Sequence, residues 1–341
     1  MLNTTRMFQE AAQAADVVRT QLARNAGALA ALGARLRLKP PRAVVTCARG
    51  SSDHAATYAK YLIESYTGVL TSSAAPSVTS IYDAHGDMRD VLFIAISQSG
   101  KSPDLLSTTR AAKEGGALTV ALCNTMDSPL MQLADVAVPL HAGAETSVAA
   151  TKSYIASLSA IAQLLACWTD DQDLLRALPK TPDLLARAWD CDWNAVVEAL
   201  RGAVNLFVVA RGFGLGVAQE AALKLKETCG LHAEAFSSAE VKHGPMALVR
   251  AGFPVLMFTQ DDDTRAGIAE LAAEFAARGA RVLLSGAQAN GALTLPTVQA
   301  PPVIEPLLAI QSFYRAADAL AQARGLDPDR PPHLNKVTET L

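Results

Sequence analysis

Three ionisable residues in the second half of the chain have the types and the spacing needed for acid–base chemistry. Glu220, Lys224 and Glu227 follow one another at intervals of four and three residues, so they share one face of a helix if residues 217–229 are helical. A carboxylate beside a lysine is suited to moving a proton to and from a carbon acid. Such a row also occurs as exposed ion pairs of small energetic worth, and on its own it favours that plainer interpretation.

The residues that follow this row strengthen the acid–base interpretation. The segment CGLHAEAFSSAEVKHGP leaves the expected helix through a glycine and adds further acids and imidazoles, among them His232, Glu234 and His243, before a rigid Gly-Pro end. The chain has no complete dinucleotide fingerprint and no Walker motif, and its histidines and cysteines lack the spacing of a metal site. Proton transfer without a metal or an organic cofactor is therefore the predicted chemistry.

A second group of candidate residues follows two predicted strands. The segment ISQSGKSPD ends one strand and opens a helix, and ARGSSDHA does the same after the preceding strand. Backbone N–H groups at a helix N-terminus, together with several hydroxyls, can bind an anion without a cation, although serines also cap ordinary helices. Because two such loops on neighbouring strands can converge, they predict one phosphate site. Its candidate side chains are Ser51, Ser52, Ser97, Gln98, Ser99 and Ser102.

These candidate residues must be positioned by an α/β fold. Short β-branched runs near residues 43, 91, 118 and 136 alternate with helix-like sequence, which is typical of a parallel sheet. Similar runs return near residues 205, 254 and 281, and Arg49-Gly50 recurs as Arg211-Gly212 at an offset of 162 residues. The recurrence indicates a tandem duplication. We therefore predict an α/β chain with an N-terminal helix and two tandem, doubly wound, parallel-sheet domains of the flavodoxin-like kind.

We expect the chain to divide into five segments. They are an N-terminal helical segment at 1–40, a first α/β domain that binds phosphate at 41–170, a helical bridge at 171–193, a second α/β domain at 194–328 and a C-terminal tail at 329–341. The second repeat has ARGFGLG and TQDDDTR where the first has its serine loops. Because these segments lack the hydroxyls and add acid, we expect the two domains to have different roles.

The composition limits the classes of partner. The 341 residues carry a formal charge of −3 without a cluster of Lys and Arg, so no nucleic-acid-binding surface is expected. Five cysteines without a CxxC pair argue against a disulfide framework and favour a reducing compartment. Acidic residues interrupt the N-terminal stretch where a signal peptide would be apolar, and the longest apolar run, YIASLSAIAQLLACW, is short for a membrane span. We expect a cytoplasmic protein that binds neither nucleic acid nor membrane.

Several of these motifs, taken together and in order, resemble a known family. SQSG with a further hydroxyl, ALKLKE, HAEA, KHGP and a C-terminal LNK are similar to the sugar isomerase (SIS) domains in the isomerase half of glutamine–fructose-6-phosphate transaminase, from residue 43 to the end. RGSSDHA, ISQSGKSPD, VAATKSY, HAEAFSSAE and the ending KVTETL resemble more closely the stand-alone glucosamine-6-phosphate deaminases of SIS type. The resemblance implies two SIS domains and a phosphorylated aminosugar substrate.

The resemblance also implies a role for each candidate residue. Glu227 matches the carboxylate that moves a proton between C1 and C2 of the sugar, with Lys224 beside it. His243 matches the imidazole that assists ring opening and is supplied by the neighbouring subunit of a homodimer. Lys336 matches a lysine on a C-terminal tail that closes over the sugar. The implied substrate-binding positions are Ser51, Ser52, Ser97, Gln98, Ser99, Ser102, Val148 and Ala150.

Two features depart from the transaminase pattern. The sequence begins MLNTTRM, without a glutaminase domain and its N-terminal cysteine, so synthesis from glutamine is not expected. Ala150 stands in VAATK where the pattern has serine, which leaves the sugar specificity open. We expect the conversion of glucosamine 6-phosphate and water to fructose 6-phosphate and ammonia. The alternatives are a galactosamine- or fructosamine-6-phosphate enzyme, a simple phosphosugar isomerase, and a sugar-phosphate sensor, which the lack of a DNA-binding segment disfavours.

Overall fold

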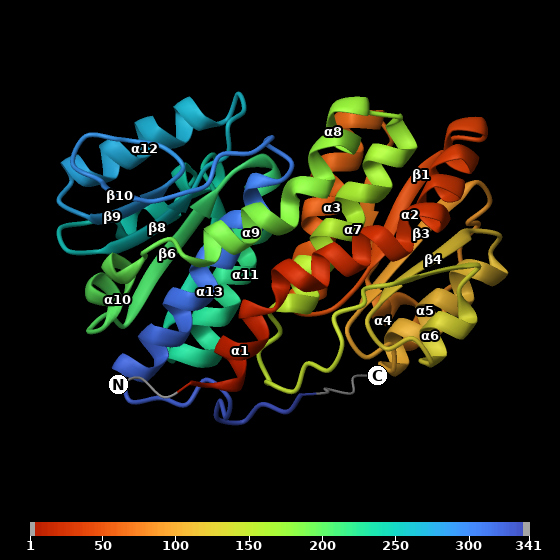
Figure 1. Cartoon of the computed structure of the whole chain (residues 1–341), viewed down its shortest axis with the longest axis horizontal. Helices are drawn as coiled ribbons and strands as arrows, with labels where there is room; N and C mark the ends of the chain where they lie inside the picture. The colour runs from red at the N-terminus through yellow and green to blue at the C-terminus, as the bar shows by residue number, and fades with distance from the viewer. Residues whose placement is uncertain (1–3, 337–341) are drawn as a thin grey trace. The chain divides into compact units, whose positions relative to one another are not determined.

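Two parallel five-stranded sheets organise the chain between residues 4 and 336, the part that the computed structural model describes (Figure 1). Of the described residues, the first-sheet unit comprises Asp16–Glu145, Lys152–Thr181, Asn335 and Lys336. The second-sheet unit comprises residues up to Ala15, Thr146–Thr151 and Pro182–Leu334. Each unit is described by itself below.

The first sheet has the strand order β2-β1-β3-β4-β5. Its strands are β1 (Ala43–Cys47), β2 (Thr71–Ser73), β3 (Val91–Ser97), β4 (Leu118–Cys123) and β5 (Val136–Pro139). All neighbours pair in parallel, and Val45 lies opposite Phe93 in the register of β1 and β3. This is the doubly wound order of flavodoxin-like sheets, in which the chain leaves β1 toward one edge and β3 toward the other.

The second sheet repeats that order. Its strands are β6 (Asn205–Ala210), β7 (His232–Ser237), β8 (Pro254–Phe258), β9 (Arg281–Ser285) and β10 (Leu293–Leu295), arranged as β10-β9-β8-β6-β7. When β6 is counted as the first strand of the repeat, the order reads 2-1-3-4-5 from the β7 edge, as in the first sheet. The predicted fold class, two tandem doubly wound α/β domains, is confirmed.

Helices pack against the sheets, and this packing explains why the central strands of each sheet are apolar. Every residue of β3 and of β8 is buried, as expected where both faces of a parallel sheet are packed. In the first-sheet unit the helices are α2 (Ala14–Leu38), α3 (Ser51–Thr67), α4 (Pro76–Ser80), α5 (Pro103–Glu114), α6 (Pro129–Leu133), α7 (Lys152–Thr169), α8 (Gln172–Ala177) and η1 (Leu178–Lys180). No helix within residues 4–336 is long and apolar enough to cross a membrane.

The second-sheet unit has its own helices and its own core. They are α1 (Arg6–Ala12), α9 (Thr181–Trp189), α10 (Asn194–Leu200), η2 (Gly212–Gly214), α11 (Leu215–Cys229), η3 (Glu240–Lys242), η4 (Pro245–Leu248), α12 (Arg265–Ala277) and α13 (Glu305–Ala323). α12 packs Ile268, Leu271 and Phe275 against one face of the sheet. On the other face α11 and α13 lie side by side, in green and blue in Figure 1. Of these two helices, α11 carries the row of Glu220, Lys224 and Glu227.

Candidate active site

The carboxyl ends of β1 and β3 place the two serine loops next to each other. These neighbouring strands are where the winding of the sheet reverses, and the crevice at such a point is the usual ligand site of a doubly wound sheet. The structure brings together all six predicted loop residues here: Ser51 and Ser52 open α3, Ser97 ends β3, Gln98 and Ser99 lie in the loop, and Ser102 is the N-cap residue of α5.

Four of these side chains carry hydroxyls that make no hydrogen bond to the described residues. Ser51, Ser52, Ser99 and Ser102 are half-buried, and within residues 4–336 their hydroxyls make no hydrogen bond. The N-cap residue of α3 is Gly50, which has no side chain, and Ser102, the N-cap residue of α5, makes no side-chain capping bond. Free hydroxyls around two helix N-termini suit an anion such as a phosphate group.

The loop after β3 depends on Gly100. Its φ of +65° lies in the left-handed region, and a Cβ placed there would lie 2.7 Å from Ser128 Cβ and 2.8 Å from Cys123 Sγ. The Gly100 N–H donates to Ser97 Oγ at 2.9 Å. Only glycine fits this turn without displacing its neighbours, so the conformation of the serine loop is strongly specified.

A side-chain bridge that the sequence analysis did not identify joins the two loops. Arg49, after β1, donates from Nε and Nη2 to Asp104 Oδ2 at 3.0 and 2.8 Å, and Asp104 lies in the first turn of α5. The Asp104 side chain is fully buried, whereas that of Arg49 is 54% exposed. Behind the bridge, burial and the nearby Asp104 carboxylate raise the pKa of Cys47 to about 12, so this thiol is a packing residue.

The expected helix over residues 217–229 is present as α11. Apolar residues such as Val217, Ala221 and Leu225 face the core, and Gly230 ends the helix with a φ of +58°. The row of Glu220, Lys224 and Glu227 is not a set of exposed ion pairs. The Lys224 ammonium contacts Glu220 Oε1 at 3.5 Å and donates to Glu227 Oε2.

The three side chains of the row differ in how much of each is exposed. The side chains of Glu220 and Lys224 are 0% and 1% exposed, whereas that of Glu227 is 19% exposed. Glu227 lines a pocket of about 580 Å³ between the end of α11 and the segment that follows α13. It is therefore the member of the row that a bound molecule can reach.

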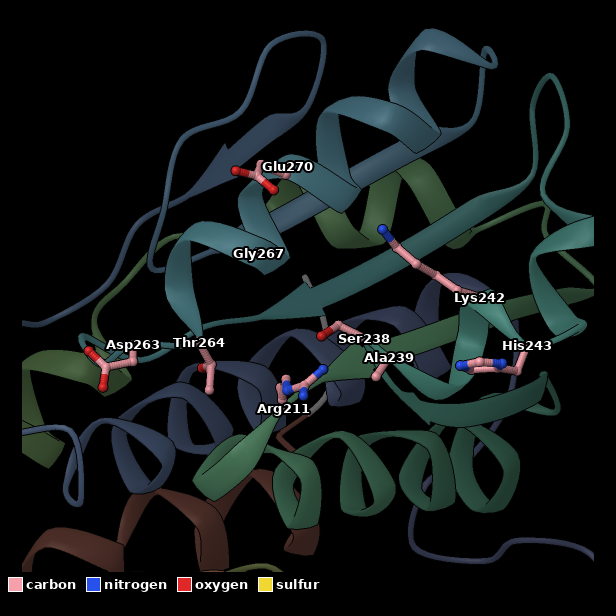
Figure 2. Close-up of a pocket in the computed structure, with 9 residues that line it drawn as sticks. All are labelled: Arg211, Ser238, Ala239, Lys242, His243, Asp263, Thr264, Gly267 and Glu270. Carbon is pink, nitrogen blue, oxygen red and sulfur yellow. The ribbon is translucent and has the colours of Figure 1, made fainter.

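His243 lies in a different pocket from Glu227. It follows η3 and lines a pocket of about 520 Å³ with Lys242, Arg211 and the start of α12 (Figure 2). Figure 2 shows Lys242 and His243 on one side of this pocket, with Asp263 and Glu270 on the α12 side. The structure thus does not bring His243 and Glu227 of the same chain together in one pocket.

In the second-sheet unit, polar side chains fill the crevice where the first-sheet unit has its free serines. Gln260 Nε2 donates to the Arg211 carbonyl at 3.0 Å, to Asp262 Oδ2 at 2.8 Å and to Thr264 Oγ1 at 2.9 Å. Asp262 also accepts from Thr264. Gln260 and the Asp262 carboxylate occupy the place where an anion would bind, which disfavours a second phosphate site.

The C-terminal lysine has a buried carboxylate partner. Lys336 Nζ lies 3.5 Å from Glu145 Oε2, and Glu145 also accepts from the backbone N–H and the hydroxyl of Ser153 at 3.1 and 2.5 Å. The sequence analysis did not single out Glu145, whose side chain is fully buried. Val148 and Ala150 are half-buried in a segment assigned to the second-sheet unit. Residues 337–341 of the predicted tail lie outside the described residues.

Ligand sets for a metal are absent from the described residues. Between residues 4 and 336, no group of three or more His, Cys, Asp or Glu side chains is arranged to hold an ion. The candidate chemical groups described above are the Lys224–Glu227 pair of the second-sheet unit and the serine loops of the first-sheet unit.

Comparison with known proteins relates this chain to proteins with SIS domains. A model of the SIS domain matches residues 37–167 and 199–292. Glutamine–fructose-6-phosphate aminotransferase [isomerizing] from Thermotoga maritima is 34% identical over 309 residues, which cover 86% of this chain and 50% of that protein. The same enzyme from Aquifex aeolicus is 33% identical over 312 residues, covering 88% and 52%. The chain thus spans about half the length of these relatives.

Solved structures share the fold over nearly the whole chain. A candidate phosphosugar isomerase from Silicibacter pomeroyi DSS-3 has a TM-score of 0.92 and 44% identity, covering 95% of this chain and 100% of its own. The C-terminal domain of glucosamine-fructose-6-phosphate aminotransferase from Francisella tularensis has a TM-score of 0.86 and 26% identity, covering 96% and 99%. Glucosamine-6-phosphate deaminase from Thermotoga maritima has a TM-score of 0.78 over 98% of this chain, and its 20% identity supports the fold alone.

Proposed function

Because the chain belongs to the SIS domain family, we propose that it is a phosphosugar isomerase that acts on an aminosugar phosphate and releases ammonia. The observation that carries the proposal is the Lys224–Glu227 pair, in which a buried ammonium holds a carboxylate that lines a pocket. The matched relatives are named glutamine–fructose-6-phosphate aminotransferase [isomerizing] and glucosamine-fructose-6-phosphate aminotransferase, and these names support the same substrate class.

We assign phosphate binding to the serine loops of the first-sheet unit. Proton transfer is assigned separately to Glu227 of the second-sheet unit. Ser51, Ser52, Ser99 and Ser102 offer free hydroxyls for the phosphate oxygens. Binding energy from the phosphate, which takes no part in the chemistry, can be used to orient C1 and C2. Val148, Ala150 and the remaining loop residues, Ser97 and Gln98, complete the proposed sugar-binding set.

The proposed reaction starts from open-chain glucosamine 6-phosphate. Glu227 removes the proton from C2, which gives an enaminol, and returns the proton to C1. The product of this transfer is the C2 imine of fructose 6-phosphate, and addition of one water releases one ammonia. Lys224 holds the Glu227 carboxylate in place throughout, and Lys336 is proposed to close over the sugar from the C-terminal tail.

His243 is proposed to assist ring opening from a second copy of the chain. Its position in a pocket separate from that of Glu227 agrees with such an assignment. Mixed dimers provide the test. Glu227→Gln and His243→Ala proteins, each inactive alone, should regain activity when they are mixed and exchange subunits, because one site in the mixed dimer has both groups intact. Inactive mixed dimers would contradict the shared site.

A simple phosphosugar isomerase is the second candidate, because the 44%-identical structure is named as a candidate phosphosugar isomerase. The two functions are separated by measuring ammonia release from glucosamine, galactosamine and fructosamine 6-phosphates in parallel with the interconversion of glucose and fructose 6-phosphates. Ammonia from an aminosugar supports the proposal and identifies the sugar. Isomerisation without ammonia favours the second candidate.

A further inference from the structure

A chain of polar contacts extends from the Lys224–Glu227 pair into the interior of the second-sheet unit. The hydroxyl of Tyr314, on α13, donates to Glu220 Oε1 at 3.0 Å. The same oxygen of Glu220 lies 3.5 Å from the Lys224 ammonium, which in turn donates to Glu227. Four side chains from two packed helices therefore form one connected series.

Exposure increases along this series. Tyr314 and Glu220 are 0% exposed, Lys224 is 1% exposed, and Glu227 is 19% exposed. A bound molecule can thus reach only the last group, and the other three must act through it. A fully buried carboxylate is unfavourable unless charged partners and hydrogen bonds compensate for its lost hydration, and Tyr314 and Lys224 both supply such contacts to Glu220.

Tyr314 is a rigid anchor for the series. Its ring is buried on α13, whose side chains are buried at nearly every position from Glu305 to Ala317, and it lies 6.3 Å from the ring of Phe313. Since the ring fixes the hydroxyl, the hydroxyl fixes one oxygen of Glu220. By contrast, Glu220 and Lys224 have long side chains that need such contacts to keep one conformation.

We propose that Tyr314 and Glu220 are positioning residues for proton transfer. The Tyr314 hydroxyl holds Glu220, Glu220 holds the ammonium of Lys224, and Lys224 holds the Glu227 carboxylate in its reactive orientation. This inference rests on the proposed role of Glu227 as the base. A small displacement of a reacting group lowers the rate strongly, so loss of the anchor should reduce turnover more than substrate binding.

Tyr314→Phe tests the inference because it removes only the hydroxyl. We expect kcat for transfer of the C2 proton to fall about 10-fold, with KM for the sugar phosphate changed by less than about twofold. The rate is measured both as ammonia release and as incorporation of solvent deuterium into fructose 6-phosphate. Tyr58→Phe, which removes the hydroxyl of a fully buried tyrosine on α3, is the matched control and should leave kcat unchanged.

A double-mutant cycle distinguishes positioning from general stability. If Tyr314 acts through Glu220, Tyr314→Phe should lower kcat by less than about twofold further in a Glu220→Gln background. If Tyr314→Phe and Glu220→Gln lowered kcat independently, so that their two effects multiplied in the double variant, the proposed series would be wrong. A Tyr314→Phe protein with wild-type kcat, or one in which kcat and KM change only in step with a lower Tm, would also overturn it.

The two measurements, ammonia release and deuterium incorporation, distinguish a failure of this inference from a failure of the proposed function. If the wild type exchanges deuterium but releases no ammonia, deamination is wrong and the exchange rate still tests Tyr314. If neither reaction occurs, crystal structures of the wild type and of Tyr314→Phe decide. Separation of Lys224 from Glu227 in the variant supports the inference, and an unchanged Lys224–Glu227 contact overturns it.

Discussion

Arg49 donates two hydrogen bonds to one carboxylate oxygen of Asp104 and so joins the loop after β1 to the helix after β3. The two partners differ sharply in exposure, because Asp104 is fully buried and the Arg49 side chain is 54% exposed. The bridge therefore has a buried charge at one end and a hydrated charge at the other. Because of this difference in exposure, replacing Arg49 and replacing Asp104 should change the free energy of unfolding by different amounts.

Replacing either partner should lower stability, but by different amounts. Arg49→Met leaves the Asp104 carboxylate buried with less compensation and should reduce the free energy of unfolding by about 2–3 kcal/mol. Asp104→Asn leaves a hydrated guanidinium and should cost about 1 kcal/mol. Urea unfolding measures both values, with Arg89→Met in the exposed Asp87–Arg89 pair as a control near zero. Equal losses for Arg49→Met and Asp104→Asn would contradict this account of the bridge.

The free serine hydroxyls should affect ligand binding and not stability. Ser52→Ala and Ser99→Ala remove hydroxyls that make no hydrogen bond within the described chain, so the free energy of unfolding should change by less than about 0.5 kcal/mol. Each loss of a hydrogen bond to a charged phosphate should raise the Kd for a sugar phosphate about 10-fold. Calorimetric titration measures the affinity, and Ser107→Ala, within α5, is the control. Unchanged affinity in both loop variants would remove the serine loops from the proposed site.

Gly100 should be far less tolerant than a glycine in a helix. Gly100→Ala places a Cβ at a φ of +65° and within 3 Å of Ser128 and Cys123, and we expect a loss of about 2–4 kcal/mol together with weaker sugar phosphate binding. Gly27 lies within α2, where a Cβ meets nothing within 4 Å, and Gly27→Ala should stabilise the protein by about 0.5–1 kcal/mol. Thermal unfolding compares the two variants. A neutral Gly100→Ala would show that the loop adopts another conformation.

Buried thiols and a buried phenol predict how stability falls in alkali. Burial raises the pKa of Cys229 to about 11 and that of Cys47 to about 12, and it raises the pKa of Tyr58 well above its usual value. The unfolded chain releases these protons from about pH 9, whereas the folded chain keeps them. The stability that they contribute is therefore complete below pH 9 and is lost as the pH rises toward 12.

The size of this loss of stability depends on how far the pKa values are raised in the folded protein. Each pKa unit corresponds to about 1.4 kcal/mol, so the three groups together should remove several kcal/mol of unfolding free energy between pH 9 and 12. Cys229→Ala should remove part of that decline, on the order of 2 kcal/mol, even though the variant is less stable at pH 7. Urea unfolding at pH 7, 9 and 11 measures the slope. An equally steep decline in Cys229→Ala would contradict the assignment.

The sequence predicted the centre of each sheet better than its edges. β1, β3, β4, β6, β8 and β9 are apolar runs with clear boundaries, and the sequence analysis located them together with the duplication. Of the edge strands it located β5, near residue 136, but not β2, β7 or β10. β7 has the sequence HAEAFS, and its alternating polar residues look like a loop with catalytic groups until its pairing with β6 is known. Edge strands carry a weak signal because only one neighbour and part of one face pack against them.

Local spacing located the serine loops and the row on α11, but not the long-range partners of these residues. The serines after β1 and β3 and the row on α11 were found because each lies within one loop or one helix face. Asp104 lies 55 residues from Arg49, and Tyr314 lies 94 residues from Glu220, so no local pattern connects them. The row of Glu220, Lys224 and Glu227 shows how far local spacing can predict a site. Its spacing equally allowed exposed ion pairs, and the burial of Lys224 became evident only when α13 was seen against α11.

The most direct test of the central claim is ammonia release from glucosamine 6-phosphate by the wild type and by Glu227→Gln. Glu198→Gln, an exposed glutamate on α10, is the matched control. We predict release by the wild type and the control, and a fall of at least about 100-fold in Glu227→Gln while sugar phosphate affinity is retained. Near-normal release by Glu227→Gln, with sugar phosphate still bound, would contradict the assignment of Glu227 as the base.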